Sequence, residues 1–138
     1  MGKCLGIDFG LKRTGISISD ESNKIAFPLK TVKSDSLINE IEDIDKTEVI
    51  GKIIIGQPYD LNGNLPNIEA NILSLIELLN TKFPNILVYR IDERFTSKIA
   101  RKTILESGIG KMKRRDKENI DKISATLILQ SYLKHNYD

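Results

Sequence analysis

The sequence GIDFGLKRTG, residues 6–15, is the stretch that decides the fold of this chain. An apolar strand predicted over residues 4–9 carries one acid, Asp8, and leads through two glycines into a second strand-like run at residues 16–19. Because side chains alternate along a strand, Asp8 shares a face with small residues near the end of a strand that looks central. A buried carboxylate without a partner costs on the order of several kcal/mol or takes up a proton. The pattern indicates a partner for Asp8, such as a divalent metal ion; alternatively, Asp8 only ends the strand and begins a turn.

The composition fits one globular domain spanning residues 1–138. The chain is 40% hydrophobic and 29% charged, which suits a single core. No apolar run approaches the roughly 20 residues that span a bilayer, and the N-terminus lacks the basic-then-apolar order of a secretion signal. We therefore expect a cytoplasmic protein with no membrane partner. The single cysteine, Cys4, excludes an internal disulfide and fits a reducing compartment.

The same counts restrict the chemistry. One cysteine and one histidine, His135, are too few for a Cys/His zinc site and make a Ser-His-Asp triad a poor fit. A metal ion would have to be held by carboxylates, which favours Mg²⁺ or Mn²⁺.

Hydrophobic spacing predicts an α/β protein with the order three strands, helix, strand, helix, strand, helix, helix. The short apolar run at residues 53–55 is typical of a strand buried on both faces of a mostly parallel sheet. The other predicted elements after the first hairpin are an edge strand at 24–32, an acidic amphipathic helix near 37–48, a helix at 68–83, a strand at 86–91, and helices at 96–107 and 119–133.

Three acids stand at element ends. Asp8 and Glu93 end strands, and Asp121 opens the last helix on the face expected to meet the sheet. Functional groups of α/β sheets gather at the carboxyl ends of strands, so these acids are candidates for one site. Carboxylates that converge need a cation, and bound Mg²⁺ would support attack of water on phosphorus.

Each acid also has an ordinary explanation. Asp121 suits the dipole of a helix N-terminus, and Glu93 could pair with Arg94 or a lysine. Asp92 competes with Glu93, because neighbouring residues of a strand point to opposite faces. We favour Glu93, because it shares a face with Tyr89 and other apolar residues, where a carboxylate needs a compensating ion.

The order and spacing of several weak motifs resemble the YqgF, or RuvX, family over nearly the whole chain. These motifs are Gly6-Ile7-Asp8-Phe9-Gly10, Lys12-Arg13-x-Gly15, Ser19-Asp20, Gly56-Gln57-Pro58 with Asn62-Gly63, Asp92-Glu93-Arg94-Phe95-Thr96-Ser97, and Asp121-x-x-Ser124-Ala125 continuing to Leu133.

The resemblance implies an RNase H-like fold, a mixed five-stranded sheet with helices on both faces, similar to Holliday-junction resolvases. It also implies a bacterial nuclease that matures the 5′ end of precursor 16S ribosomal RNA. Carried over by motif, Asp8, Glu93 and Asp121 would be the catalytic acids and the ligands of Mg²⁺ or Mn²⁺. The chain departs from the family pattern at Lys117-Glu118 and Ile123-Ser124, which should affect the preceding loop more than the acids.

Basic residues crowd between residues 108 and 118, where we expect a mobile loop. Together with cations near the acids, this loop contrasts with the acidic helix and suits a nucleic-acid backbone on one face, although lysine-rich loops are commonly just solvated. With only 6% aromatic residues, base stacking is a weak candidate for recognition. The candidate nucleic-acid-binding residues are Lys12, Arg13, Arg94, Lys111, Lys113, Arg114 and Arg115.

Two other functions compete with a nuclease. The Asp-x-Gly loop also resembles the first phosphate loop of sugar kinases and actin-like ATPases, but those proteins need two such domains and this chain has no second loop. The other is a non-catalytic nucleic-acid-binding module in transcription or on the ribosome. The sequence does not decide between RNA and branched DNA as the substrate. It also leaves open whether the protein associates with the ribosome, whether it binds one or two metal ions, and which oligomeric state it adopts.

Overall fold

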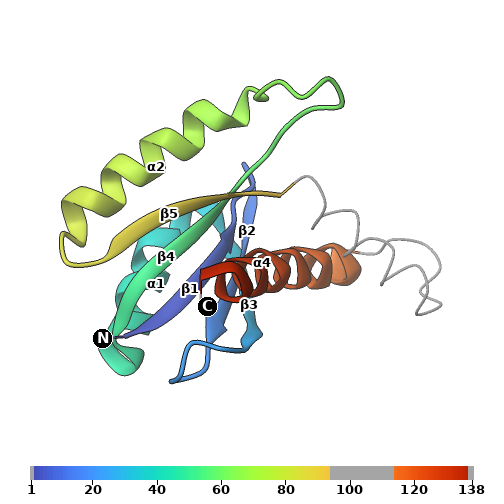
Figure 1. Cartoon of the computed structure of the whole chain (residues 1–138). Coiled ribbons are helices and arrows are strands. Elements are labelled where there is room, and N and C mark those ends of the chain that lie inside the picture. The colour runs from blue at the N-terminus through green and yellow to red at the C-terminus, as the bar shows by residue number, and fades with distance from the viewer. Residues whose placement is uncertain (1, 94–113, 137–138) are drawn as a thin grey trace.

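The computed structural model describes residues 2–93 and 114–136 (Figure 1). In these residues, a five-stranded sheet has the strand order β3-β2-β1-β4-β5. The elements are β1 (Lys3–Asp8), β2 (Arg13–Ser19), β3 (Ala26–Lys33), the 3₁₀ turn η1 (Ser34–Ser36), α1 (Leu37–Glu48), β4 (Ile50–Gln57), α2 (Ile68–Lys82), β5 (Leu87–Asp92) and α4 (Arg114–Asn136).

The sheet is mixed, as expected. The first three strands form an antiparallel meander, whereas β4 runs parallel to β1, and β5 runs parallel to β4. The strand with Pro28 is at an edge, where a missing backbone donor costs no ladder hydrogen bond. The central position of β1 explains why its apolar residues are fully buried.

Helices cover both faces of the sheet, which confirms the predicted layers. In Figure 1, α4 crosses in front of the strands and α1 lies behind them. The face toward α1 and α2 buries a core of Leu5, Ile7, Ile16, Leu37, Ile41, Ile44, Ile53, Ile55, Ile72, Leu75 and Leu79. The face toward α4 buries a smaller core of Cys4, Ala26, Ile54, Ile128, Leu129 and Leu133. The alternation of Cys4 and Leu5 between these cores confirms the strand parity read from the sequence.

Glycines let α4 lie directly on the strands. A Cβ added to Gly15 would be 2.0 Å from the carbonyl oxygen of Asp121, and one added to Gly6 would be 2.6 Å from the carbonyl oxygen of Ala125. Side chains at these two positions would therefore push the helix off the sheet. The close packing places Asp121 over the ends of β1 and β2.

The start of α4 corrects one prediction. We expected the helix to begin at residue 119 after a basic loop, but it begins at Arg114. Residues 114–118 contain arginine, lysine and glutamate, which are good helix formers, and no glycine or proline. They carry no apolar stripe, so periodicity alone overlooked them. The predicted helix at 96–107 and the basic loop before residue 114 lie outside the described residues.

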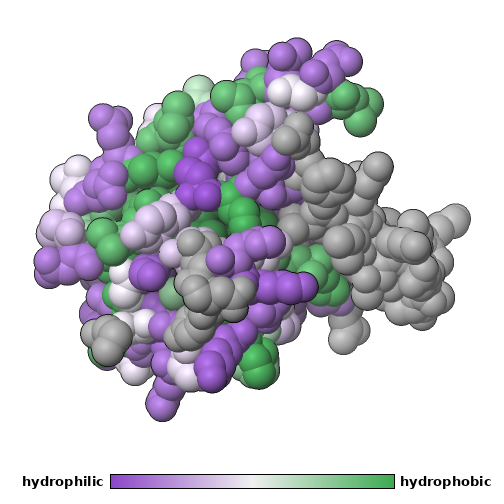
Figure 2. Space-filling view, viewed as in Figure 1, coloured by the Kyte–Doolittle hydropathy of each residue, from purple (hydrophilic) through white to green (hydrophobic). Residues whose placement is uncertain are grey.

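The described surface is mostly hydrophilic. Figure 2 shows hydrophilic side chains over most of this face, with smaller apolar areas between them. No helix within residues 2–93 and 114–136 has the length and apolar character to cross a membrane.

Candidate active site

Asp8 lies at the end of the central strand between two glycines. It pairs with Gly15 of β2, and the register of β1 with β4, which runs to Ile7 opposite Ile55, brings Gly56 to its other side. Neighbouring strands are about 4.8 Å apart, and because both neighbours of Asp8 lack side chains, groups from other elements can approach its carboxylate over them. By alternation Asp8 points to the face covered by α4, because Gly6 faces that helix.

Glu93 reaches the same face from the end of β5. Its backbone N–H donates to the carbonyl oxygen of Gln57 at 3.2 Å. Its Oε2 is 2.0 Å from the point where a Cβ on Gly56 would lie, and Ile128 of α4 is next to the same point. Glu93 therefore lies above Gly56 beneath α4, on the side of Asp8. The neighbouring Asp92 is exposed.

The environment of Glu93 favours its protonated form. Burial raises the pKa of its carboxyl group to about 7. The nearby cation of Arg90 opposes this rise, whereas the carboxylates of Asp92 and Glu69 add to it. A carboxylate held there at neutral pH is destabilised until a cation compensates it.

Asp121 approaches Asp8 from the opposite side. Its carbonyl oxygen lies over Gly15, and its Oδ2 accepts a short, charge-assisted hydrogen bond from Nε of Arg13. Burial raises the pKa of Asp121, while the hydrogen bond and charge of Arg13 oppose the rise and Glu118 adds to it. Arg13 thus supplies part of the positive charge that Asp121 requires.

The three acids lie around the end of β1, but their side chains do not form a complete metal-binding site. Asp121 lies over Gly15 on one side of Asp8, and Glu93 lies over Gly56 on the other. In the part of the chain that the structure describes, no three His, Cys, Asp or Glu side chains lie close enough together to hold one ion. The donor set still fits Mg²⁺ or Mn²⁺, because it consists of carboxylate oxygens and two of them are desolvated. In the described residues the three acids approach the end of β1 from separate elements, and their joint role as a metal site stays a prediction.

The predicted nucleic-acid-binding residues fall into three groups. Lys12 and Arg13 lie next to the acids, in a groove that also reaches the first turns of α4. Arg114 and Arg115 form the beginning of α4. Arg94, Lys111 and Lys113 lie outside the described residues.

The structure adds a brace beneath the acids that we did not predict from the sequence. Glu69 of α2 is only 7% exposed and accepts two hydrogen bonds from the guanidinium of Arg90, at 2.7 and 3.0 Å. The same guanidinium donates to the carbonyl oxygens of Ile55 and Gly56, and Gln57 donates to Glu69 at 3.2 Å. Arg90 thereby lowers the pKa of Glu69 and ties α2 to the ends of β4 and β5. The sequence did contain one signal for this buried acid: Glu69 stands three residues before Ile72, so both lie on the same face of the helix.

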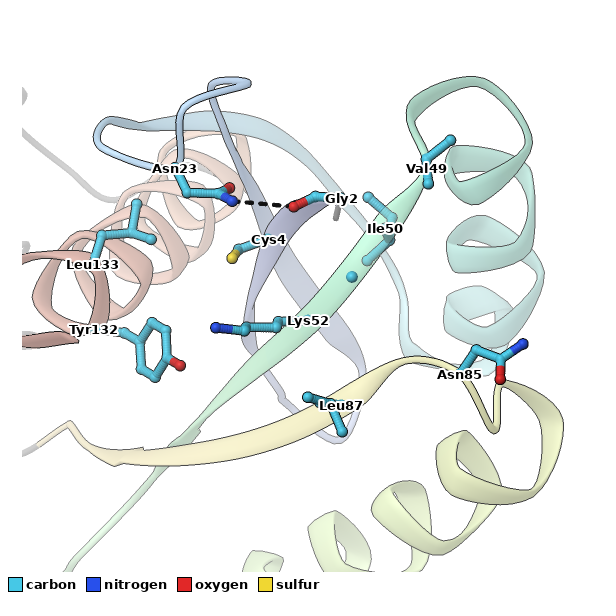
Figure 3. A pocket seen from close by; sticks show the side chains of 11 residues that line it. Gly2, Cys4, Asn23, Val49, Ile50, Lys52, Asn85, Leu87, Tyr132 and Leu133 are labelled. Carbon is cyan, nitrogen blue, oxygen red and sulfur yellow. Dashed lines mark hydrogen bonds between the residues drawn. The ribbon is translucent and has the colours of Figure 1, made fainter. Parts of the chain in front are cut away.

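A second hollow lies at the opposite end of the strands and is separate from the acids. It has a volume of about 650 Å³ and is lined by Cys4, Lys52, Tyr132 and neighbours of these residues, whereas Asp8, Glu93 and Asp121 do not line it. In Figure 3 the side chain of Lys52 extends toward Tyr132, and its Nζ is 5.8 Å from that ring centroid.

Comparison with known proteins agrees with this architecture. The family model RuvX, described as "Holliday junction resolvase", matches residues 2–135. A protein of Christiangramia forsetii named "Putative pre-16S rRNA nuclease" is 40% identical, over 96% of this chain and 98% of its own length. Proteins of the same name from Flavobacterium johnsoniae and Porphyromonas gingivalis are each 42% identical, over 96% of both chains.

A solved structure shares the fold. The structure titled "T. thermophilus RuvC in complex with Holliday junction substrate" superimposes with a TM-score of 0.58 at 16% identity, covering 98% of this chain and 96% of the other. The fold is therefore RNase H-like, as the sequence motifs implied. With a family model that spans residues 2–135 and relatives at 40–42% identity, the chain belongs to the RuvX family.

Proposed function

We propose that this protein is a metal-dependent nuclease that hydrolyses phosphodiester bonds in structured nucleic acid, and that it acts on the 5′ end of precursor 16S ribosomal RNA. One observation carries the proposal: two acids from other elements, Glu93 and Asp121, flank Asp8, and both have raised pKa values. The names of the relatives, which specify pre-16S rRNA nucleases, support the choice of substrate. The family description supports a further activity on Holliday junctions.

Asp8, Glu93 and Asp121 have the role of metal ligands in this proposal. Mg²⁺ or Mn²⁺, when bound, supplies the Lewis acidity that activates a water molecule and stabilises the departing oxygen. Binding of the cation relieves the cost of the desolvated carboxylates of Glu93 and Asp121. Arg13, whose guanidinium lies beside Asp121, would be placed to pair with a phosphate of the substrate.

A non-catalytic nucleic-acid-binding module is the second candidate. It is favoured by the distances among the acids, which do not form a ready chelate in the described residues, and by the ion pair between Arg13 and Asp121. In that case the acids and Arg13 would form a structural network, and the surrounding cations would hold nucleic acid without cutting it.

Cleavage assays separate the two candidates. Purified protein is offered a precursor 16S rRNA fragment and a four-way DNA junction side by side, with Mg²⁺, Mn²⁺ or a chelator. We expect cleavage only with metal, and a loss of at least about a hundredfold in Asp8→Asn, as for removal of other single electrostatic catalytic groups. Asp43→Asn is the matched control, because Asp43 is a 71% exposed acid on α1.

Cleavage in chelator would refute the metal dependence. Binding without cleavage by every preparation, or near-normal turnover in Asp8→Asn after contaminating nucleases are excluded, would favour the binding module. A precursor rRNA substrate also implies action in the bacterial cytoplasm on ribosome precursors. Whichever of the rRNA fragment and the DNA junction is cleaved more efficiently identifies the natural substrate.

A further inference from the structure

A groove beside Asp121 extends the site in one direction. Its volume is about 670 Å³, and its walls come from the β1–β2 connection with Lys12, the end of β3 with Lys33, and the first turns of α4 with Lys117. Arg13 belongs to both the groove and the acids, because its guanidinium donates to Asp121. The groove therefore opens directly onto the candidate active site.

Hydrogen bonds hold the walls of the groove in place. Oγ1 of Thr31 donates to the carbonyl oxygen of Glu118 at 2.7 Å and joins β3 to α4. Ser34 joins the end of β3 to the first hairpin: its N–H donates to Lys12 at 3.0 Å, and its Oγ donates to Gly10 at 2.5 Å. A preformed groove of this kind loses little conformational freedom when an extended ligand binds.

Three of the four cations of the groove are available for an external anion, and the fourth, Arg13, is paired with Asp121. Among residues 2–93 and 114–136, the side chains of Lys12, Lys33 and Lys117 form no ion pair, whereas Lys3, Lys30, Lys46, Lys82 and Arg90 each pair with a carboxylate. Two acids, Asp35 and Glu118, also line the groove. With Arg13 paired to Asp121, the three lysines against these two acids leave a net positive lining next to the candidate active site.

We propose that this groove binds the sugar–phosphate backbone of the strand that is cut, with Lys33 and Lys117 contacting phosphates near the scissile one. The inference rests on the proposed nuclease function; it adds Lys33 to the substrate path, together with Lys117 from the basic stretch noted in the sequence. Lysines act as point charges toward phosphates, and contacts to phosphates position a strand without reading its sequence. Among the residues that the structure describes, no aromatic side chain lines the groove, so its described lining suits contacts to phosphates and not base stacking.

The test measures binding against salt concentration. The parent is Asp8→Asn, and the probes are a labelled four-way DNA junction and a precursor 16S rRNA fragment. The test variant adds Lys33→Gln and Lys117→Gln. The matched control adds Lys24→Gln and Lys134→Gln, which remove two exposed lysines outside the groove.

We expect the test variant to flatten the slope of log affinity against log salt by about 1.8 on DNA duplex arms. This corresponds to about 60-fold weaker binding at about 0.1 M salt. Asp35→Asn in the same parent should tighten binding, because it removes a negative charge from the groove. The control should leave the slope unchanged, and unfolding curves should coincide with that of the parent.

A cleavage readout separates this inference from the proposed function. With Asp8 intact, changes at Lys33 and Lys117 should raise KM and leave kcat nearly unchanged, since they remove binding that is equal in the ground and transition states. If the wild-type protein cleaves the substrate but the test variant has the same salt slope as the control, the groove proposal is refuted and the nuclease proposal is not. A flattened slope without any cleavage supports the groove as a backbone-binding site and refutes the nuclease. A parent that binds neither probe refutes the groove.

Discussion

Glu93 should make the metal-free protein less stable as the pH rises. Its pKa is raised from 4.5 to about 7 by burial above Gly56, so the folded state binds a proton more tightly than the unfolded state does. This contribution to stability is therefore fully present below about pH 4.5 and is lost as the pH rises through about 7. At about 1.4 kcal/mol per pH unit, the full cost is about 3 kcal/mol, of which about 2.5 kcal/mol appears between pH 5 and pH 8. Glu93→Gln should lack this decline.

The assay is urea unfolding in chelator at about pH 5 and pH 8. Asp121 also has a raised pKa and contributes to the decline in every variant, so the difference between wild type and Glu93→Gln isolates Glu93. Asp92→Asn is the matched control; it removes an exposed carboxylate that contributes only a secondary part of the shift. Equal pH dependence in wild type and Glu93→Gln would refute the reasoning. Added Mg²⁺ should stabilise wild type more than Glu93→Gln at pH 8 if Glu93 is a ligand.

Three further predictions concern packing and ion pairs, and each is measured by urea unfolding at about pH 7. Gly15→Ala places a Cβ 2.0 Å from the carbonyl oxygen of Asp121, so we expect a loss of about 1–3 kcal/mol; an unchanged midpoint would mean that α4 does not pack so closely. Arg90→Met should cost about 3–5 kcal/mol by leaving Glu69 buried without its cation, and adding Glu69→Leu should recover most of it; no recovery would contradict the ion-pair explanation. Arg13→Gln should cost no more than about 1 kcal/mol, because the pair is partly exposed, and Mg²⁺ should restore the loss; a larger loss that Mg²⁺ leaves unchanged would make Arg13 a structural residue.

Within the described residues, the order of elements and their inward faces could be predicted from the sequence, because both follow from local periodicity. Alternation around Asp8 placed Leu5 and Ile7 on one face and the acid on the other, and the two hydrophobic cores confirm that division. The same rule put Glu93 on the apolar face of its strand, where the structure has it. The beginning of α4 was wrong because its first residues favour a helix without an apolar stripe.

The arrangement around Asp8 depended on contacts between residues far apart in the chain. The register of β1 with β2 and β4 brings glycines to both sides of Asp8, and no local pattern specifies that register. The ion pair of Arg13 with Asp121 joins residues 108 positions apart, and it depends on where α4 crosses the sheet. The groove lysines and the brace of Glu69 with Arg90 likewise come from separate elements. The sequence by itself determined which residues are candidates for the chemistry, while only tertiary packing decided which of them become neighbours, since interhelical and interstrand distances are set by side chains that meet only in the folded state.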